Sequence, residues 1–250
     1  MPPLDYLWLL FAGLGGGLTG SVAGLASLVS YPALLAIGMG PVSANVTNTV
    51  ALVFSSVGAV SGSRPELTGQ RSRARRLGLF AFAGGVAGSA LLLLTPSGDF
   101  ARIVPFFIGG ASLAILVRSR AERNATPALP RPGWRLNAAV LAVTIYGGYF
   151  GAAAGVALLV ILLFTTAETL ARANAMKNVL VGLTNAVAAI GFAAFGPVHW
   201  LAVLPLGAGS LIGGRLGPNV VRRAPTGLLR ILIACGGLAL AVHLGLNAFR

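Results

Sequence analysis

The sequence predicts an all-α polytopic membrane protein made of two inverted-topology repeats, each with five helical segments. Composition is the first observation: 56% of the 250 residues are hydrophobic, only 9% are charged, and the mean hydropathy is +0.86. A water-soluble domain needs far more charge to cover its surface. The other two observations are the alternation of apolar stretches with short basic loops and a match between the two halves of the chain.

Hydropathy predicts about ten apolar segments, several of them near the roughly 20 residues that one bilayer crossing requires. They cover residues 5–19, 21–37, 45–62, 77–95, 101–118, 136–150, 152–167, 175–195, 200–216 and 228–248. Glycine-rich turns, not polar loops, join the first segment to the second and the sixth to the seventh. Each of these pairs is therefore one long helix, two short crossings or a re-entrant hairpin.

Basic residues form four clusters between the apolar segments, at 64–76, 118–135, 172–177 and 215–230. If each glycine-joined pair runs up and back, all four clusters lie on one side of the membrane. If each pair is a single helix, the last cluster lies on the opposite side from the others. Because basic loops are retained in the cytoplasm, we predict the up-and-back arrangement, with both termini outside. Hairpins and thin crossings satisfy the rule equally.

The two halves resemble each other at offsets of 131, 129 and 125 residues. The matches are Gly16, Gly17, Gly20 and Gly24 with Gly147, Gly148, Gly151 and Gly155; Ala44, Asn45 and Val50 with Ala173, Asn174 and Val179; and Gly84 and Gly88 with Gly209 and Gly213. Five segments is an odd number, so the second repeat enters the membrane from the opposite face. Such inverted repeats are typical of transporters whose substrate site lies near the midplane.

The repeats define three regions of the chain. We predict a first transmembrane repeat at 1–118, a cytoplasmic linker at 119–134 and a second transmembrane repeat at 135–250. The linker is rich in arginine and contains Pro127, Pro130 and Pro132, with little that could pack.

Glycines gather at the two turns that join the short segments. They are Gly13, Gly15, Gly16, Gly17, Gly20 and Gly24 in the first half, and Gly147, Gly148, Gly151 and Gly155 in the second. Small residues four apart let helices pack closely in lipid. Alternatively, these glycines break the helices at membrane depth, where the exposed N–H groups attract an anion. Both interpretations can hold for different glycines.

Polar residues form one helical face of the third segment and recur in the eighth. The face contains Asn45, Asn48, Thr49, Ser55 and Ser56, which become Asn174, Lys177, Asn178, Thr184 and Asn185 at an offset of 129. Interhelical hydrogen bonds would explain a lone Ser or Thr. Asn and Lys are costlier to bury, so their recurrence favours the lining of a pathway. Lys177 supplies a positive charge in one repeat only, unless it reaches to the cytoplasmic interface.

The remaining side chains exclude several functions. The acidic residues lie at segment ends or in loops, which argues against cation transport and against a carboxylate proton relay. No set of His, Cys and acidic residues forms a metal or phosphotransfer site, so we predict no metal, no cofactor and no enzymatic activity. The basic residues flank apolar segments and do not form a solvated, aromatic-rich face, which excludes nucleic acid as a partner.

Three stretches of the first half carry a resemblance to the sulfite exporter TauE/SafE family of membrane anion transporters. They are Gly15-Gly16-Gly17, Tyr31-Pro32-Ala33-Leu34-Leu35, and the stretch from Gly38 to Ala44 that leads into the polar helix. A weaker second copy extends the resemblance over nearly the whole chain. That copy departs from the pattern, because Gly151-Ala152-Ala153-Ala154-Gly155 replaces a richer glycine run and Leu162-Leu163 lacks the proline.

The resemblance implies movement of sulfite, organosulfonates or related small anions across the bacterial inner membrane, usually outward. We therefore predict a multi-pass secondary transporter or exporter that works by alternating access, with a small anion and the lipid bilayer as its partners. A non-transporting membrane scaffold or assembly protein is the alternative. The candidate substrate-binding residues are Gly16, Gly17, Gly20, Asn45, Asn48, Thr49, Gly147, Gly148, Gly151, Asn174, Lys177 and Asn178.

Overall fold

The computed structural model describes residues 1–121, 133–166 and 168–223, together with positions 238, 242 and 246. Every regular element in these ranges is an α-helix, and no strand occurs among them, which confirms the predicted all-α class. The predicted segment at 228–248 lies largely outside the described residues, as does the linker at 119–134. Each of the other nine predicted segments corresponds to one helix.

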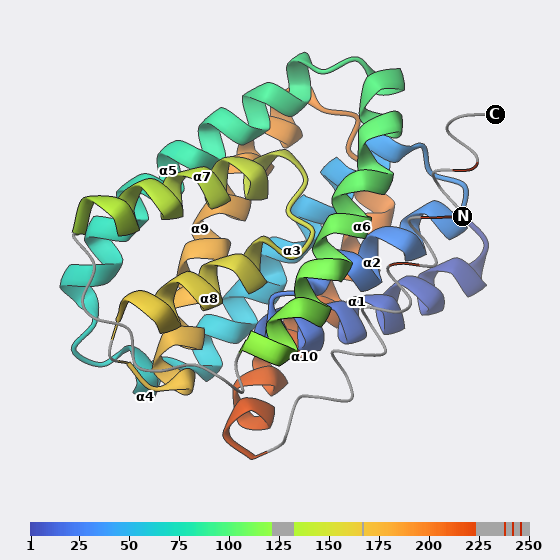
Figure 1. Cartoon of the computed structure of the whole chain (residues 1–250). Helices are drawn as coiled ribbons and strands as arrows, with labels where there is room; N and C mark the ends of the chain where they lie inside the picture. The colour runs from blue at the N-terminus through green and yellow to red at the C-terminus, as the bar shows by residue number, and fades with distance from the viewer. Residues whose placement is uncertain (122–132, 167, 224–237, 239–241, 243–245, 247–250) are drawn as a thin grey trace.

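The first half of the chain contains six helices (Figure 1). They are α1 (Pro3–Ala23), α2 (Ala26–Ala36), α3 (Pro41–Gly62), α4 (Arg64–Leu67), α5 (Arg71–Leu94) and α6 (Ser97–Ala121). Prolines begin α1 and α3, where their fixed φ suits a first helical turn and no N–H is required. The single-turn helix α4 was not predicted, because it lies in the polar, basic stretch between two apolar segments.

The described part of the second half contains four helices. They are α7 (Gly133–Tyr149), α8 (Ala154–Thr165), α9 (Leu170–Phe195) and α10 (Trp200–Arg223). The Thr169 hydroxyl caps α9 by accepting a hydrogen bond from the Arg172 N–H at 3.4 Å. The Gly196-Pro197 pair then separates α9 from α10.

Within the described ranges, four helices are long and apolar enough to cross a bilayer, namely α1, α3, α5 and α9. The helices α2 and α8 contain only 11 and 12 residues, well short of the roughly 20 that a crossing requires. Large apolar side chains such as Leu79, Leu94, Ile190, Phe195 and Leu204 are exposed on the outer surface of the long helices. An apolar surface of this kind is compatible with lipid.

Two helix pairs flank a central pair in the bundle. The helix α1 packs along α10, α5 packs along α7, and α3 and α9 contact each other between them (Figure 1). The central helices run antiparallel. Thr47, near the start of α3, accepts a hydrogen bond from the His199 N–H beyond the end of α9 at 2.9 Å. At the other end, Gln70 Nε2 donates to the Arg172 carbonyl near the start of α9 at 3.2 Å.

An equivalent close contact at a glycine occurs in each of the two flanking helix pairs. Gly213 on α10 lies so near α1 that an added Cβ would overlap the Leu14 carbonyl oxygen. Gly88 on α5 lies equally near α7, and a Cβ there would overlap the Ile145 carbonyl oxygen. The offset of 125 relates Gly88 to Gly213, and the offset of 131 relates Leu14 to Ile145. The offsets read from the sequence therefore also relate contacts between helices.

Ion pairs join the basic clusters at one end of the bundle. Glu168 pairs with Arg73 at 2.7 Å and with Arg172, while Glu66 pairs with Arg222 at 2.7 Å. Hydrogen bonds from Arg172 and Arg73 hold the pKa of Glu168 below its usual value. Residues from three of the four predicted clusters thus meet on one side, as the up-and-back arrangement requires.

Candidate functional site

The helix α1 stops inside the bundle because Gly24 turns the chain. Gly24 has a φ of +78°, in the left-handed region that favours glycine. Its N–H donates to the Gly20 carbonyl at 2.8 Å, and the Leu25 N–H donates to the Thr19 carbonyl at 3.4 Å. This pattern closes the last turn of a helix, and α2 begins at Ala26.

The second half contains a corresponding break, about one helical turn earlier. There α7 ends at Tyr149, and Gly151 (φ +79°) and Ala153 (φ +58°) turn the chain into α8. Gly151 corresponds to Gly20, which lies inside α1, so α1 has an additional final turn relative to α7. The two repeats therefore differ at the point where they are expected to bind a ligand.

The two breaks contact each other through glycines. An added Cβ at Gly155 would lie 2.6 Å from Gly24 Cα, and one at Gly24 would overlap the Gly155 carbonyl carbon. Only residues without a side chain allow the backbones to approach this closely. The offset of 131 relates Gly24 and Gly155 to one another, so the halves meet at equivalent positions.

Other glycines of the predicted site serve helix packing. Gly17 lies against the backbone of α10, Gly148 lies against Gly85 of α5, and Gly16 lies against Ser30 of α2. The glycine-rich turns therefore contain both helix breaks and packing contacts. Gly24 and Gly151 turn the chain at the breaks, whereas glycines inside α1 and α7 allow neighbouring helices to pack closely; attraction of an anion to the breaks stays a prediction.

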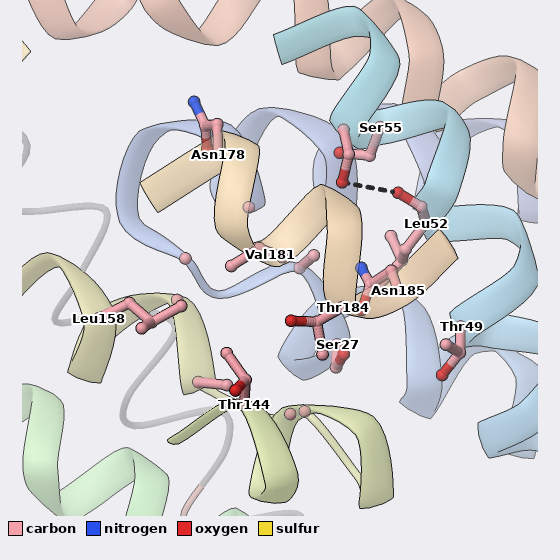
Figure 2. Close-up of a pocket in the computed structure, with 18 of the residues that line it drawn as sticks. Ser27, Thr49, Leu52, Ser55, Thr144, Leu158, Asn178, Val181, Thr184 and Asn185 are labelled. Atoms are coloured by element: carbon pink, nitrogen blue, oxygen red, sulfur yellow. Dashed lines mark hydrogen bonds between the residues drawn. The ribbon is translucent and has the colours of Figure 1, made fainter. Parts of the chain in front are cut away.

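A cavity of about 50 Å³ lies beside the two breaks, bordered by α1, α2, α3, α7, α8 and α9. On the same scale a single buried water requires about 10–15 Å³. The cavity therefore has room for a small ligand. Figure 2 shows its lining, with Asn178 and Thr184 of α9, Thr49 of α3 and Thr144 of α7 around the space.

Equivalent residues from both halves line this cavity. The pairs are Gly20 with Gly151, Gly24 with Gly155, Ser27 with Leu158, Thr49 with Asn178, Leu52 with Val181, Ser55 with Thr184, and Ser56 with Asn185. Each pair follows the offset of 131 or 129 found in the sequence. The cavity thus lies where the two halves of the molecule meet, and both contribute corresponding segments to its wall.

The cavity wall combines hydrogen-bonding and apolar groups. Serine and threonine hydroxyls and the amides of Asn178 and Asn185 contribute the polar part, and Leu52, Phe150 and Val181 contribute to the apolar part. Among the described residues that line the cavity, none carries a charged side chain. Charge must therefore come from the backbone or from residues behind the lining.

The backbone contributes two helix N-termini. Ala26 and Ser27 begin α2, Ala154 and Gly155 begin α8, and all four line the cavity. Neither helix has a side-chain hydrogen bond that caps its first turn. The first N–H groups of a helix lack intrahelical partners and carry partial positive charge. This arrangement favours a negatively charged ligand.

The predicted site residues fall into two groups. Gly20, Thr49, Gly147, Gly151 and Asn178 line the cavity. The predicted residues outside the lining are Gly16, Gly17, Asn45, Asn48, Gly148, Asn174 and Lys177. The polar members of this second group hydrogen-bond to residues of the helix breaks.

On α3, Asn45 and Asn48 tie that helix to the segments around the cavity. Asn45 Nδ2 donates to the Tyr149 carbonyl, at the end of α7, at 2.9 Å. Asn48 Nδ2 donates to the hydroxyl of Ser27, a lining residue, at 3.2 Å. Both side chains are 1% exposed, so these bonds form in the interior of the bundle.

On α9, Lys177 and Asn174 bind the end of α1. Lys177 is 0% exposed, and its ammonium donates to the Gly20 carbonyl at 2.8 Å and to the Ser21 carbonyl at 3.1 Å. Asn174 Nδ2 also donates to the Ser21 carbonyl, at 2.9 Å. Lys177 is therefore directed at the carbonyls of a broken helix and not at the basic end of the bundle.

Ser27 and Thr144 also line the cavity, although neither is among the predicted site residues. Repeat matching favours residues that recur in both halves. Ser27 corresponds to Leu158, and Thr144 corresponds to Gly13, so neither position produced a match. In addition, the described residues contain no group of three His, Cys, Asp or Glu side chains close enough to hold a metal ion.

Comparison with known proteins identifies the family. The model of the sulfite exporter TauE/SafE family matches residues 9–244. This chain belongs to the TauE/SafE family. It is 25% identical over 229 residues to the Probable membrane transporter protein YfcA of Escherichia coli (strain K12), covering 90% of this chain and 84% of YfcA.

A second relative is the Probable membrane transporter protein ORF9 of Sinorhizobium sp, which is 23% identical over 237 residues. That match covers 95% of this chain and 91% of ORF9. No solved structure matches the chain. Family membership and the apolar helices together identify a multi-pass membrane transporter, and they confirm the resemblance noted in the sequence.

Proposed function

We propose that this TauE/SafE family member is a secondary transporter that exports a small anion, sulfite or an organosulfonate, across the bacterial inner membrane. The observation that carries the proposal is the presence of two helix N-termini, those of α2 and α8, in the lining of one cavity. Each N-terminus acts as roughly half a positive charge. Together they offset about one negative charge, which suits a monoanion.

The side chains of the cavity support the same ligand class. Hydroxyl and amide groups such as those of Ser27, Asn178 and Asn185 supply neutral hydrogen-bond donors for the oxygens of a sulfite or sulfonate group. The apolar part, which includes Phe150 and Val181, suits the short organic group of a sulfonate. No acidic residue lines the described cavity to repel the anion.

Two inverted repeats, at 1–118 and 135–250, would provide alternating access to this site. The equivalent lining residues and the equivalent contacts of α1 with α10 and of α7 with α5 support a two-fold relation between the repeats. Because the equivalent helices α3 and α9 run antiparallel, a two-fold axis that relates them would lie in the membrane plane. Rocking of one repeat against the other would expose the cavity to each side in turn.

The direction of transport follows from charge. If the end that carries the Arg73–Glu168 and Glu66–Arg222 pairs faces the cytoplasm, the orientation obeys the positive-inside rule. An inside-negative membrane potential then expels a monoanion with about 2.3 kcal/mol per 100 mV. Export therefore requires no coupling ion.

A flux measurement under an imposed voltage tests the proposal. Proteoliposomes containing the full chain are loaded with labelled sulfite or a small sulfonate, and the sign of the membrane potential is set with a potassium gradient and an ionophore. We expect efflux to accelerate when the interior is negative and to slow when the sign is reversed. Flux that ignores the sign of the potential would contradict electrogenic export.

A cavity variant tests the site. Asn178→Leu removes a donor from the lining at similar volume and should weaken anion binding about tenfold, because the anion loses a charge-assisted hydrogen bond. Asn219→Leu, at an exposed position of α10, is the matched control. Unchanged affinity of Asn178→Leu, with reduced thermal stability, would instead favour the scaffold alternative, in which polar residues only hold helices together.

A further inference from the structure

The end of α1 presents an electrostatic problem to an anion site. Gly20 and Ser21 line the cavity, and their carbonyls belong to the last turn of a broken helix. Such carbonyls carry partial negative charge, which disfavours an anion nearby. In transporters with broken helices, carbonyls of this kind bind the coupling cation.

The Lys177 ammonium lies where such a cation would bind. It donates to the Gly20 carbonyl at 2.8 Å and to the Ser21 carbonyl at 3.1 Å. Asn174 and Asn178 reach the same Ser21 carbonyl from the same helix, at 2.9 and 3.4 Å. Three side chains of α9 therefore converge on the carbonyl end of α1.

We propose that the ammonium of Lys177 replaces a coupling cation, so that the protein carries its own counter-charge and transports its anion without sodium. The inference rests on the proposed function, since it concerns the charge balance of the same anion site. Lys177 acts on the substrate through the end of α1 and is in this sense a positioning residue. Its charge offsets the carbonyls and leaves the N-termini of α2 and α8 to dominate the potential in the cavity.

The asymmetry between the repeats supports this role. The residue equivalent to Lys177 is Asn48, which donates to the Ser27 hydroxyl at the start of α2 and not to the carbonyls at a helix C-terminus. The helix α7 ends about one turn earlier than its equivalent α1, so the second repeat lacks the additional carbonyl-bearing turn. The first repeat thus has the additional helical turn, at the end of α1, and the second repeat supplies the additional positive charge, from Lys177.

Removing the charge should create a cation site. In a Lys177→Met variant the Gly20 and Ser21 carbonyls lose the ammonium but keep their positions near the cavity. Asn174 Oδ1 is buried and makes no hydrogen bond within the described structure, so rotation of this amide adds a third oxygen ligand. Oxygen ligands of this kind suit Na⁺ or Li⁺.

The experiment compares wild type with Lys177→Met in choline, sodium and lithium chloride at equal ionic strength. Thermal unfolding of the purified proteins reports cation binding, because a ligand that prefers the folded state raises the unfolding temperature. Flux of labelled sulfite in proteoliposomes reports transport. We expect Na⁺ or Li⁺ to stabilise only the variant, and the variant's flux to fall about tenfold in choline and to recover in sodium.

Two control variants separate the charge at this position from general effects. Lys177→Arg keeps the positive charge and should remain indifferent to sodium. Arg64→Met removes an exposed positive charge from α4 and should show no sodium-dependent stabilisation. If Lys177→Met does not fold, Lys177→Asn, which restores the residue type of the first repeat, takes its place in both measurements.

Several results would overturn the inference. These are stabilisation of the wild type by sodium, wild-type flux of Lys177→Met in choline, or a folded variant that neither Na⁺ nor Li⁺ stabilises. The unfolding measurement requires no transported anion. If neither protein moves sulfite while sodium still stabilises only the variant, the result contradicts sulfite as the substrate. It still supports the inference that the Lys177 ammonium occupies a cation position at the end of α1.

Discussion

Gly24 and Gly155 illustrate how single residues determine the centre of this molecule. Each lies at a helix break, and the absence of a side chain lets the two halves touch backbone to backbone. Gly24 must also adopt a positive φ, which ordinary residues avoid. Two independent constraints therefore act on the same position.

Substitution of Gly24 by alanine separates these constraints. We expect Gly24→Ala to destabilise the protein by about 1–3 kcal/mol more than Gly38→Ala, because overpacking adds to the strain of a positive φ. Gly38 is the matched control, with a φ of +87° and nothing within 4 Å of an added Cβ. Thermal unfolding in detergent measures both variants, and equal losses of stability would show that the contact with Gly155 contributes nothing.

At the scale of helices, close packing arises from small residues that occur in equivalent places. Gly88 lets α5 approach α7, and Gly213 lets α10 approach α1. In lipid, where burial of apolar side chains brings little gain, such close contacts are a main source of helix association. Close contacts at glycine therefore stabilise both flanking pairs, α5 with α7 and α1 with α10.

Matched substitutions at these positions test whether the pairs are equivalent. Gly88→Ala and Gly213→Ala should each cost about 1–3 kcal/mol, because the added methyl group meets a carbonyl of the neighbouring helix. Gly110→Ala, in α6 and with open space around it, should instead gain up to about 1 kcal/mol from its higher helix propensity. Reversible unfolding gives all three values, and a large loss for only one of the pair would mean that the two contacts differ.

Considered as a whole, the molecule has one strongly basic end. Ion pairs of Glu66 and Glu168 with arginines join α4, α5, α9 and α10 there. The positive-inside rule predicts that this end faces the cytoplasm. The predicted orientation of the whole protein thus depends on the side on which its loops carry arginine.

Site-specific labelling tests that orientation. In a Cys235→Ser background, Ser72→Cys places one exposed thiol at the start of α5, and Ser97→Cys places one at the start of α6, across the membrane. An impermeant maleimide added to intact cells should label position 97 but not position 72. Labelling of position 72 alone would reverse the assignment.

Much of the helix architecture could be predicted, whereas the details of the site could not. The polar face of Asn45, Asn48 and Thr49 identified α3 as a buried helix, because polar groups in lipid must face protein. The same pattern did not reveal that Thr49 lines the cavity while Asn45 binds the Tyr149 carbonyl. A helical face indicates only that a residue points inward, and the partner depends on which helix end lies opposite.

The amino-acid sequence alone determined the all-α membrane class, the similarity between the two halves and the gathering of basic loops at one end of the bundle. These properties follow from hydropathy and charge, to which a bilayer responds segment by segment. Only the tertiary structure decided where α1 ends, which residues share a cavity, and that Lys177 meets the carbonyls of Gly20 and Ser21. The Lys177 contacts join segments more than 150 residues apart, and the break at Gly24 meets Gly155 in the other half of the chain. Local sequence patterns do not encode such contacts.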